Sequence, residues 1–283
     1  MSAYKELFGK YVRSVSSDPP AALGEGEIWY NTSSNVFKTV VKVGAWASGE
    51  VLANARQSLA AAGTQTAGLA FGGRLPNNSP TGITEEYDGT NWANSNSLGT
   101  SRFALAGAGS QTAGLAFGGN PSVSASEEYN GSSWTEGDNL NNGRTSLAGA
   151  GIQTAALAFG GTPPFSGETE SYNGSSWTAL GSMNVSRVGI AGCGTTAAAL
   201  GFGGEGNAPS YTLYNSSEEW DGSSWTAGNN LNTARQQAGA SGIQTAALAF
   251  GGQNPARALT EEYDGTSWTE VNDMSTARYS HGG

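Results

Sequence analysis

Few side chains in this sequence could carry chemistry. There is one histidine, His281, and one cysteine, Cys193, so a metal site built from three histidines is impossible. A Ser-His-Asp triad would have to use His281. A glycosidase that works with two carboxylates stays open as an alternative, but no acidic residue stands apart from its counterparts elsewhere in the chain. We therefore expect no enzyme, and no catalytic, metal-binding or cofactor-binding residue.

Arginine recurs in a fixed register. Each of six tryptophans has an arginine ten residues later, and glutamates precede most of the aromatic residues. The pairs are Trp46 and Arg56, Trp92 and Arg102, Trp134 and Arg144, Trp177 and Arg187, Trp225 and Arg235, and Trp268 and Arg278. Such an arginine can fork onto a carboxylate or stack on a tryptophan, which would be a structural role. A ring of arginines around a central anion is the functional alternative.

The same register predicts the fold. A Gly-Gly pair follows each of the first five tryptophans, with its second glycine always 27 residues on, and the tryptophans recur at intervals in the forties. Asn-Gly or Asp-Gly, the strongest short hairpin signal, recurs between strand-like segments. Each unit therefore supplies about four short antiparallel strands, which is typical of a β-propeller blade. We predict an all-β protein.

Residue size within the unit predicts how the blades pack. Alanine and glycine dominate the first two strands, where blades converge on the axis, and Cys193 among them is expected to be a small buried residue. Aromatic pairs at an offset of five, such as Tyr87 and Trp92, lie in the outer two strands. We interpret these pairs as packing between blades.

A Gly-Gly after an apolar strand, followed by an aromatic pair, resembles the Kelch repeat family. The resemblance covers five full units and implies a Kelch-like propeller, although the turn between tyrosine and tryptophan is shorter here. Kelch-type oxidases need two histidines around copper, which this chain lacks. Asp264-Gly265 before Trp268 also differs from the sialidase box in its Asp-to-Gly spacing.

The number of blades depends on how the ring closes. Five units are complete, and a sixth begins at Arg278. Residues 36–43 and 45–48, with Trp46 in register, could supply its outer strands. We predict six blades with one composite closing blade made from both ends of residues 27–283, to which residues 27–50 contribute the outer strands. Five blades with overlapping ends is the alternative.

Length varies only between Gly-Gly and the next aromatic residue. These connections emerge on one face of a propeller, and variable loops on a rigid scaffold are where recognition usually occurs. The candidate recognition residues are Arg74, Asn77, Asn78, Asn120, Phe165, Tyr211, Tyr214, Gln253, Asn254 and Arg257. Their side chains suit hydrogen bonding and stacking against sugars, and solvated turns are the alternative.

The net charge of −10 opposes binding to a phosphate backbone, so we expect no nucleic-acid partner. We also expect no signal peptide and no membrane span, because the sequence has no apolar stretch of the required length. The protein would thus be made in a cytoplasm.

The N-terminal segment carries a second resemblance. Gly26-x-Ile28-Trp29-Tyr30-Asn31, then Phe37-Lys38 and Gly44-x-Trp46, resembles a segment of tail-fibre and other virion proteins of marine bacteriophages. The resemblance implies a non-enzymatic, tail-associated virion protein, present in several copies. Residues 1–26 would dock on other virion proteins, while the propeller loops bind a host-surface glycan or a neighbouring virion protein. A head decoration or tail scaffold protein is one alternative, and a propeller glycosidase acting on host polysaccharide is another.

Overall fold

The computed structural model describes residues 13–15, 28–33, 36–39, 45–121, 123–207, 209, 211–253 and 255–282. The chain forms two compact units, Met1–Ala45 and Trp46–Gly283. In the first unit β1 (Arg13–Val15) pairs in parallel with β2 (Ile28–Asn31), which pairs antiparallel with β3 (Val36–Thr39). Residues 1–26, expected as a docking segment, lie outside the described residues except for 13–15. No helix among the described residues is long and apolar enough to cross a membrane.

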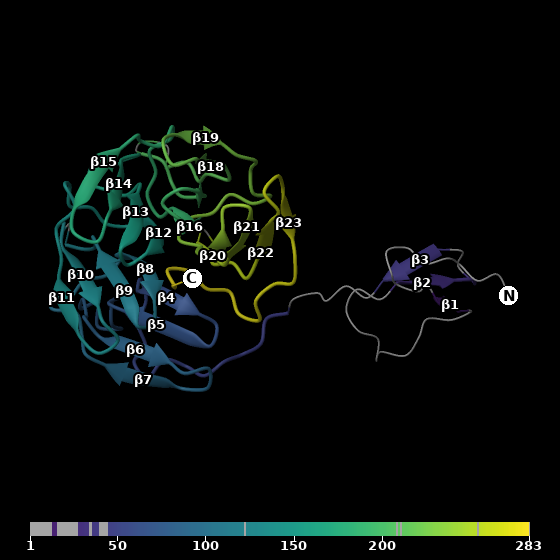
Figure 1. Cartoon of the computed structure of the whole chain (residues 1–283), viewed down its shortest axis with the longest axis horizontal. Coiled ribbons are helices and arrows are strands. Elements are labelled where there is room, and N and C mark those ends of the chain that lie inside the picture. Colours follow the sequence, from purple (N-terminus) through teal and green to yellow (C-terminus); the bar gives the residue numbers. More distant parts are fainter. Residues whose placement is uncertain are drawn as a thin grey trace. The chain divides into compact units, whose positions relative to one another are not determined.

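The second unit is a five-bladed β-propeller (Figure 1). Each blade is a sheet of four antiparallel strands in chain order, with the first strand nearest the axis. Blade 1 is β4 (Ala60–Thr64), β5 (Ala67–Phe71), β6 (Thr84–Tyr87) and β7 (Trp92–Ser95). Blade 2 is β8 (Ala106–Ser110), β9 (Ala113–Phe117), β10 (Ser126–Tyr129) and β11 (Trp134–Glu136). Blade 3 is β12 (Ala148–Ile152), β13 (Ala155–Phe159), β14 (Thr169–Tyr172) and β15 (Trp177–Leu180). Blade 4 is β16 (Ala191–Gly194), β17 (Ala199–Phe202), β18 (Ser217–Trp220) and β19 (Trp225–Ala227). Blade 5 is β20 (Gly239–Ile243), β21 (Ala246–Phe250), β22 (Thr260–Tyr263) and β23 (Trp268–Glu270).

The all-β propeller is confirmed, and so is the five-blade alternative. The prediction of six blades is wrong: no sixth four-stranded sheet forms among the described residues. The physical reason lies in strand pairing, because β2 and β3 pair with each other and with β1. Residues 45–48 form no strand, and residues 40–43 lie outside the described part of the chain.

The two ends of the propeller nevertheless meet beside blade 5. The ring of Trp46 lies 5.1 Å from that of Phe250, and its Nε1–H donates to Thr260 Oγ1 over 2.9 Å. From the other end, the His281 ring stacks on Phe250 at 5.3 Å. Overlapping ends are therefore part of the five-bladed structure.

Small residues are required near the axis. A Cβ on Gly107 would lie 2.6 Å from Phe71 Cζ, and one on Gly192 would lie 2.4 Å from Phe159 Cζ. Both distances are too short for real carbon atoms, so a larger residue would force the blades apart. The predicted small buried cysteine is confirmed: Cys193 is 6% exposed, and burial raises the pKa of its thiol to about 12.

Tryptophan and phenylalanine join neighbouring blades. Trp134 of blade 2 contacts Phe71 of blade 1 with ring centroids 5.0 Å apart, and its Nε1–H donates to Thr84 Oγ1 over 2.9 Å. The predicted aromatic pairs instead lie within one blade, as Tyr129 faces Trp134 across adjacent strands at 4.9 Å. Packing between blades therefore depends on the tryptophan of each pair and on a phenylalanine of the neighbouring blade, which the sequence analysis did not include.

Candidate functional site

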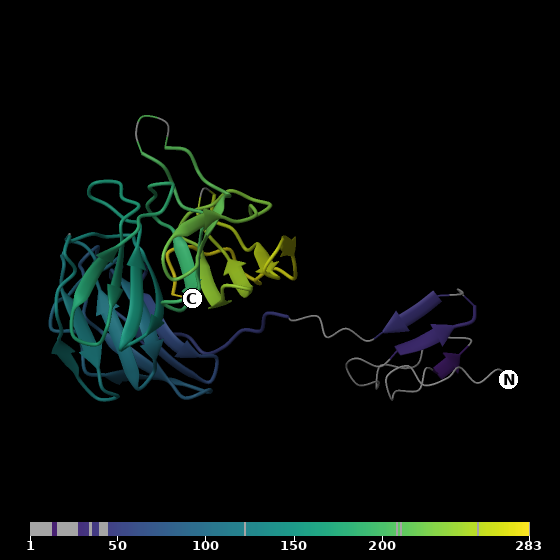
Figure 2. The ribbon, with the colours of Figure 1, turned by 45° about the horizontal axis from the view of Figure 1, so that its top comes forward.

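The strand directions place all the variable loops on one face of the propeller. In every blade the second and fourth strands run towards this face, so it carries the loop after each Gly-Gly and the connection to the next blade. We call it the loop face, and we call the opposite side, which carries the two hairpin turns of each blade, the turn face. The loop of blade 4 stands out furthest from the ring, in green in Figure 2.

Buried ion pairs anchor the loop face. Arg102 donates from Nη2 to Glu127 Oε1 over 3.1 Å and from Nη1 to the carbonyl of Gly118 over 3.2 Å. The Glu127 carboxylate also accepts the backbone N–H groups of Gly99 (2.6 Å) and Thr100 (3.3 Å), which holds the connection between blades. The equivalent pairs are Arg56 with Glu85, Arg144 with Glu170, Arg187 with Glu218 and Arg235 with Glu261.

These five arginines are structural. Their side chains are at most 1% exposed and their charges are matched within their own blades. Burial lowers the pKa of the Arg102 guanidinium and Glu127 opposes that shift, but an arginine stays protonated in a protein. The predicted fork onto a carboxylate is confirmed, and for these five residues the alternative of a ring around a central anion is wrong.

A closed ring of backbone hydrogen bonds surrounds the axis on the loop face. We call it the axial ring; its members are Ser58, Ala104, Ser146, Gly189, Gln237 and Ser280. Each donates its N–H to the carbonyl of the preceding member, and Ser58 donates to Ser280, over distances of 2.6–3.1 Å. All six have left-handed backbone angles, with φ between 51° and 63°. Five are not glycine, and an L-residue in this conformation stores about 1–2 kcal/mol, so the surrounding blades hold it in place.

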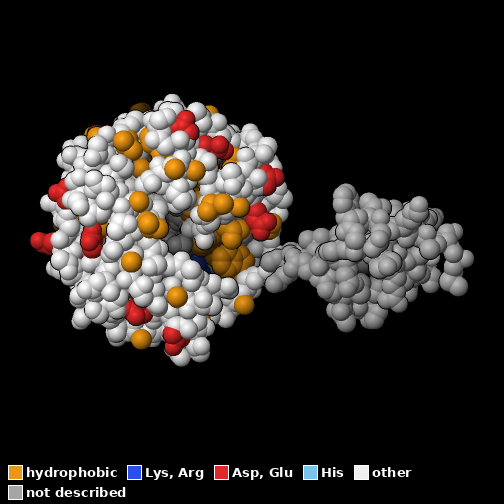
Figure 3. All heavy atoms as spheres, in the orientation of Figure 1, with side chains coloured by type: hydrophobic (Ala, Val, Ile, Leu, Met, Phe, Trp, Pro, Cys, Tyr) orange, Lys and Arg blue, Asp and Glu red, His pale blue; other side chains and the backbone are white. Residues whose placement is uncertain are grey.

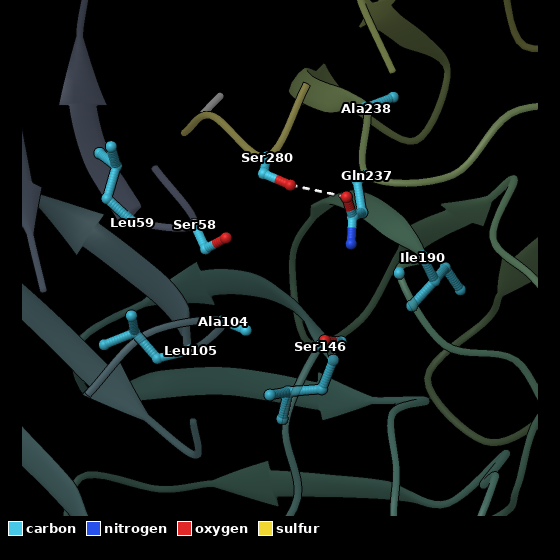
Figure 4. A pocket seen from close by; sticks show the side chains of 11 residues that line it. Ser58, Leu59, Ala104, Leu105, Ser146, Ile190, Gln237, Ala238 and Ser280 are labelled. Atoms are coloured by element: carbon cyan, nitrogen blue, oxygen red, sulfur yellow. Dashed lines mark hydrogen bonds between the residues drawn. The ribbon is translucent and has the colours of Figure 1, made fainter. Parts of the chain in front are cut away.

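A shallow pocket of about 90 Å³ lies at the axial ring (Figure 4). The polar side chains around it come from the ring: Ser280 Oγ donates to Gln237 Oε1 over 2.6 Å, and Ser58 and Ser146 add hydroxyls. The residue after each of five ring members is apolar and also lines the pocket: Leu59, Leu105, Leu147, Ile190 and Ala238. Hydroxyl and amide groups beside an aliphatic surface can take a small ligand group that is polar on one side and apolar on the other.

The candidate recognition residues occupy the loop face in separate blades and do not converge on one point. Asn77, Asn78 and Tyr211 are exposed, and Tyr211, at 58%, is the most exposed aromatic side chain among the described residues of the propeller. The half-buried ones are Arg74, Asn120, Phe165, Tyr214, Gln253 and Arg257. Asn254 lies outside the described residues.

Several of these side chains already have partners within the propeller. The guanidinium of Arg74 lies 5.2 Å from the ring centroid of Phe103, and that of Arg187 lies 5.2 Å from the ring of Tyr214. Asn77 accepts the N–H of Ser79 through its own side chain, 3.0 Å away. Asn78 and Tyr211 are left as the exposed groups best placed to meet a ligand. The pocket residues of the axial ring were missed, because Ser, Ala and Gln give no sequence signal for left-handed backbone.

No group of three or more His, Cys, Asp or Glu side chains that could hold a metal occurs among the described residues. His281 is largely buried against Phe250, and burial lowers its pKa. Acidic side chains are spread around the ring rather than concentrated at its centre (Figure 3).

No protein-family model matches this sequence, and the comparison with curated proteins finds no match. The likeness to Kelch repeats and to phage virion proteins therefore depends only on the residues quoted above.

Proposed function

We propose that this protein is a non-enzymatic bacteriophage virion component, tail-associated, whose loop face binds a host-surface glycan or a neighbouring virion protein. The fold supports a binding or structural role: buried ion pairs hold five unequal loops on one face. The Kelch type and the virion origin are supported by the repeat and by the N-terminal segment that resembles virion proteins.

One observation carries the choice of the loop face. Tyr211 is 58% exposed on the loop that projects furthest, and its N–H donates to the carbonyl of Asn207 over 3.4 Å. An exposed tyrosine has only two side-chain torsions, so it can stack on the apolar face of a sugar ring at little entropic cost. Asn78 and the pocket at the axial ring would add hydrogen bonds.

A glycan array and an adsorption assay on host cells, both with the recombinant full chain, test the proposal. Tyr211→Ala should weaken binding about tenfold or more, since aromatic anchors commonly contribute at least 1.4 kcal/mol. Ile243→Ala is the matched control, because Ile243 is 55% exposed but lies on the turn face.

Equal losses in the two variants would contradict recognition by the loop face. Absence of binding to any glycan or cell, with the chain found in the head or throughout the tail of the particle, would favour the decoration or scaffold role. Its position and copy number in an image of the particle would decide between those two.

A further inference from the structure

The place between blade 5 and blade 1 is only partly filled. We call it the closing position; residues 46–49 hold its outer edge and residues 278–282 its inner edge. Trp46 packs on blade 5 as Trp134 packs on blade 1, and Ser280 completes the axial ring. The two middle strands that every blade has, such as β5 and β6 in blade 1, have no counterpart here among the described residues.

An arginine that would bind a middle strand is left exposed. In the five blades the arginine before the first strand binds a glutamate of the third strand, as Arg102 binds Glu127. Arg278 stands in the same register, ten residues after Trp268. Its side chain is exposed and forms no ion pair within the described part of the protein.

A glutamate on blade 5 is left exposed in the same way. Elsewhere a third-strand tyrosine donates its hydroxyl to a glutamate of the preceding blade, as Tyr172 does to Glu128 over 2.6 Å. The counterpart on blade 5, Glu262, is exposed, and none of the described tyrosines donates to it.

Blade 1 presents further groups to the closing position. Gln111 and its counterparts Gln153 and Gln244 donate to backbone carbonyls in the middle strands of the preceding blade, over 2.6–3.2 Å. Gln65, the equivalent in blade 1, is exposed. Trp134 packs on Phe71 of the preceding blade, whereas the ring contact that Trp92 makes among the described residues is with Tyr87 of its own blade.

Apolar side chains are also exposed there. Trp46 is 40% exposed and Tyr279 39%, and both belong to the segments that hold the closing position. Figure 3 shows hydrophobic side chains gathered beside the central opening.

We propose that the closing position binds two antiparallel β-strands of a partner polypeptide with the chemistry of the repeat's own middle strands. The first strand would be apolar and end in Phe-Gly-Gly, so that its phenylalanine packs on Trp92. The second would carry a glutamate that binds Arg278 and, two residues later, a tyrosine that donates to Glu262. Main-chain bonds to the two edges would give affinity and these side chains specificity, as in other cases of strand addition. This inference does not depend on recognition by the loop face.

A peptide with the sequence of residues 113–129 is the probe, because it contains both middle strands of blade 2, including Glu127 and Tyr129. Fluorescence anisotropy of the labelled peptide with the full chain should show saturable binding of one peptide per chain. Arg278→Gln in the protein should weaken it about tenfold or more, because it leaves a carboxylate unpaired. The peptide with Glu127→Gln should lose as much, and combining the two changes should cost little more than either alone.

Glu136→Gln is the control, because Glu136 is an exposed charged residue on the outer strand of blade 2, outside the closing position, and this variant should bind the peptide normally. Because Arg278 is exposed, its substitution should leave the melting temperature unchanged, which separates lost binding from unfolding. The proposal is overturned if no saturation occurs at about 1 mM peptide. It is also overturned if neither Arg278→Gln in the protein nor Glu127→Gln in the peptide changes the affinity. A dimer in light scattering that Arg278→Gln abolishes would assign the position to a second copy, and would equally overturn it.

Discussion

Ser58 donates its backbone N–H to the carbonyl of Ser280 over 2.6 Å, and this bond joins the start of blade 1 to the last described residues of the chain. Ser280 in turn donates to the carbonyl of Gln237 over 3.1 Å, on blade 5. The ring of five blades is thereby closed by a short segment with no sheet of its own. The stability of that segment should control how readily the ring opens.

Closure should weaken in mild acid. Burial, with a smaller contribution from Arg278, lowers the pKa of His281 in the folded protein. Below the ordinary histidine pKa of about 6.5 the unfolded segment then binds more protons than the folded one, so stability falls as pH falls. The protection factors of the Ser58 and Ser280 amides, which are the intrinsic exchange rates divided by the observed rates, should therefore fall between about pH 7 and pH 5.5.

Two variants separate charge from size in that experiment. His281→Leu places an aliphatic side chain where Leu59 and Leu105 stand in blades 1 and 2, so it should slow exchange and remove the pH dependence. His281→Gln should remove the pH dependence without the gain. Persistence of the acid effect in either variant would show that another group causes it.

Loss of one buried carboxylate should be severe. Glu127→Gln leaves the Arg102 guanidinium buried with an uncompensated charge, and it also weakens the bonds that hold Gly99 and Thr100. Breaking a buried pair in this way costs about 3–5 kcal/mol. Urea unfolding followed by tryptophan fluorescence should show this as a lower midpoint.

Glu136→Gln is the control for that measurement. Glu136 lies opposite Glu127 on the neighbouring strand but is exposed, so its loss should change the free energy of unfolding by no more than about 0.5 kcal/mol. Similar costs for the two substitutions would mean that the Arg102–Glu127 pair contributes little.

Relief of backbone strain should stabilise the axial ring. Ala104 has φ of 51°, which costs an L-residue about 1–2 kcal/mol and a glycine almost nothing. Glycine also increases the conformational entropy of the unfolded chain, which offsets part of this gain. Ala104→Gly should therefore raise the free energy of unfolding by up to about 1 kcal/mol. Ala106→Gly, two residues on in a regular strand, should instead lower it by about 0.5–1 kcal/mol. A loss at position 104 as large as that at 106 would refute the strain argument.

The repeat predicted most of the blade, since its signals are local. The two glycines of Gly72-Gly73 have φ of 66° and 111°, and Asp88 Oδ1 accepts the N–H groups of Thr90 and Asn91 over 2.7 Å each. Glycine, asparagine and aspartate favour such turns over most other conformations, so the turns can be predicted from residue type. The pairing of Arg102 with Glu127 followed from register and opposite charge.

What escaped prediction depends on contacts between distant segments. Trp46 has the register of a blade tryptophan, but a tryptophan can pack on Phe250 without the rest of a blade behind it. Likewise, nothing in the types of Ala104 or Gln237 indicates a left-handed backbone, because the neighbouring blades impose it. The loops after Gly-Gly lie on one face, as the repeat predicted, but internal partners such as Phe103 beside Arg74 had no sequence signal.

The backbone groups of the axial ring bond to one another: its six N–H groups donate to its six carbonyl groups. A ligand at the opening would therefore meet side chains: those of the ring, which are three serines, an alanine and a glutamine beside one glycine, and the apolar ones that follow them. These side chains can be substituted while the ring of backbone hydrogen bonds stays intact. At the opening of this propeller, backbone atoms hold the ring together and side-chain atoms would determine which ligand binds. Ligand selectivity could therefore be redesigned there by substitution of side chains.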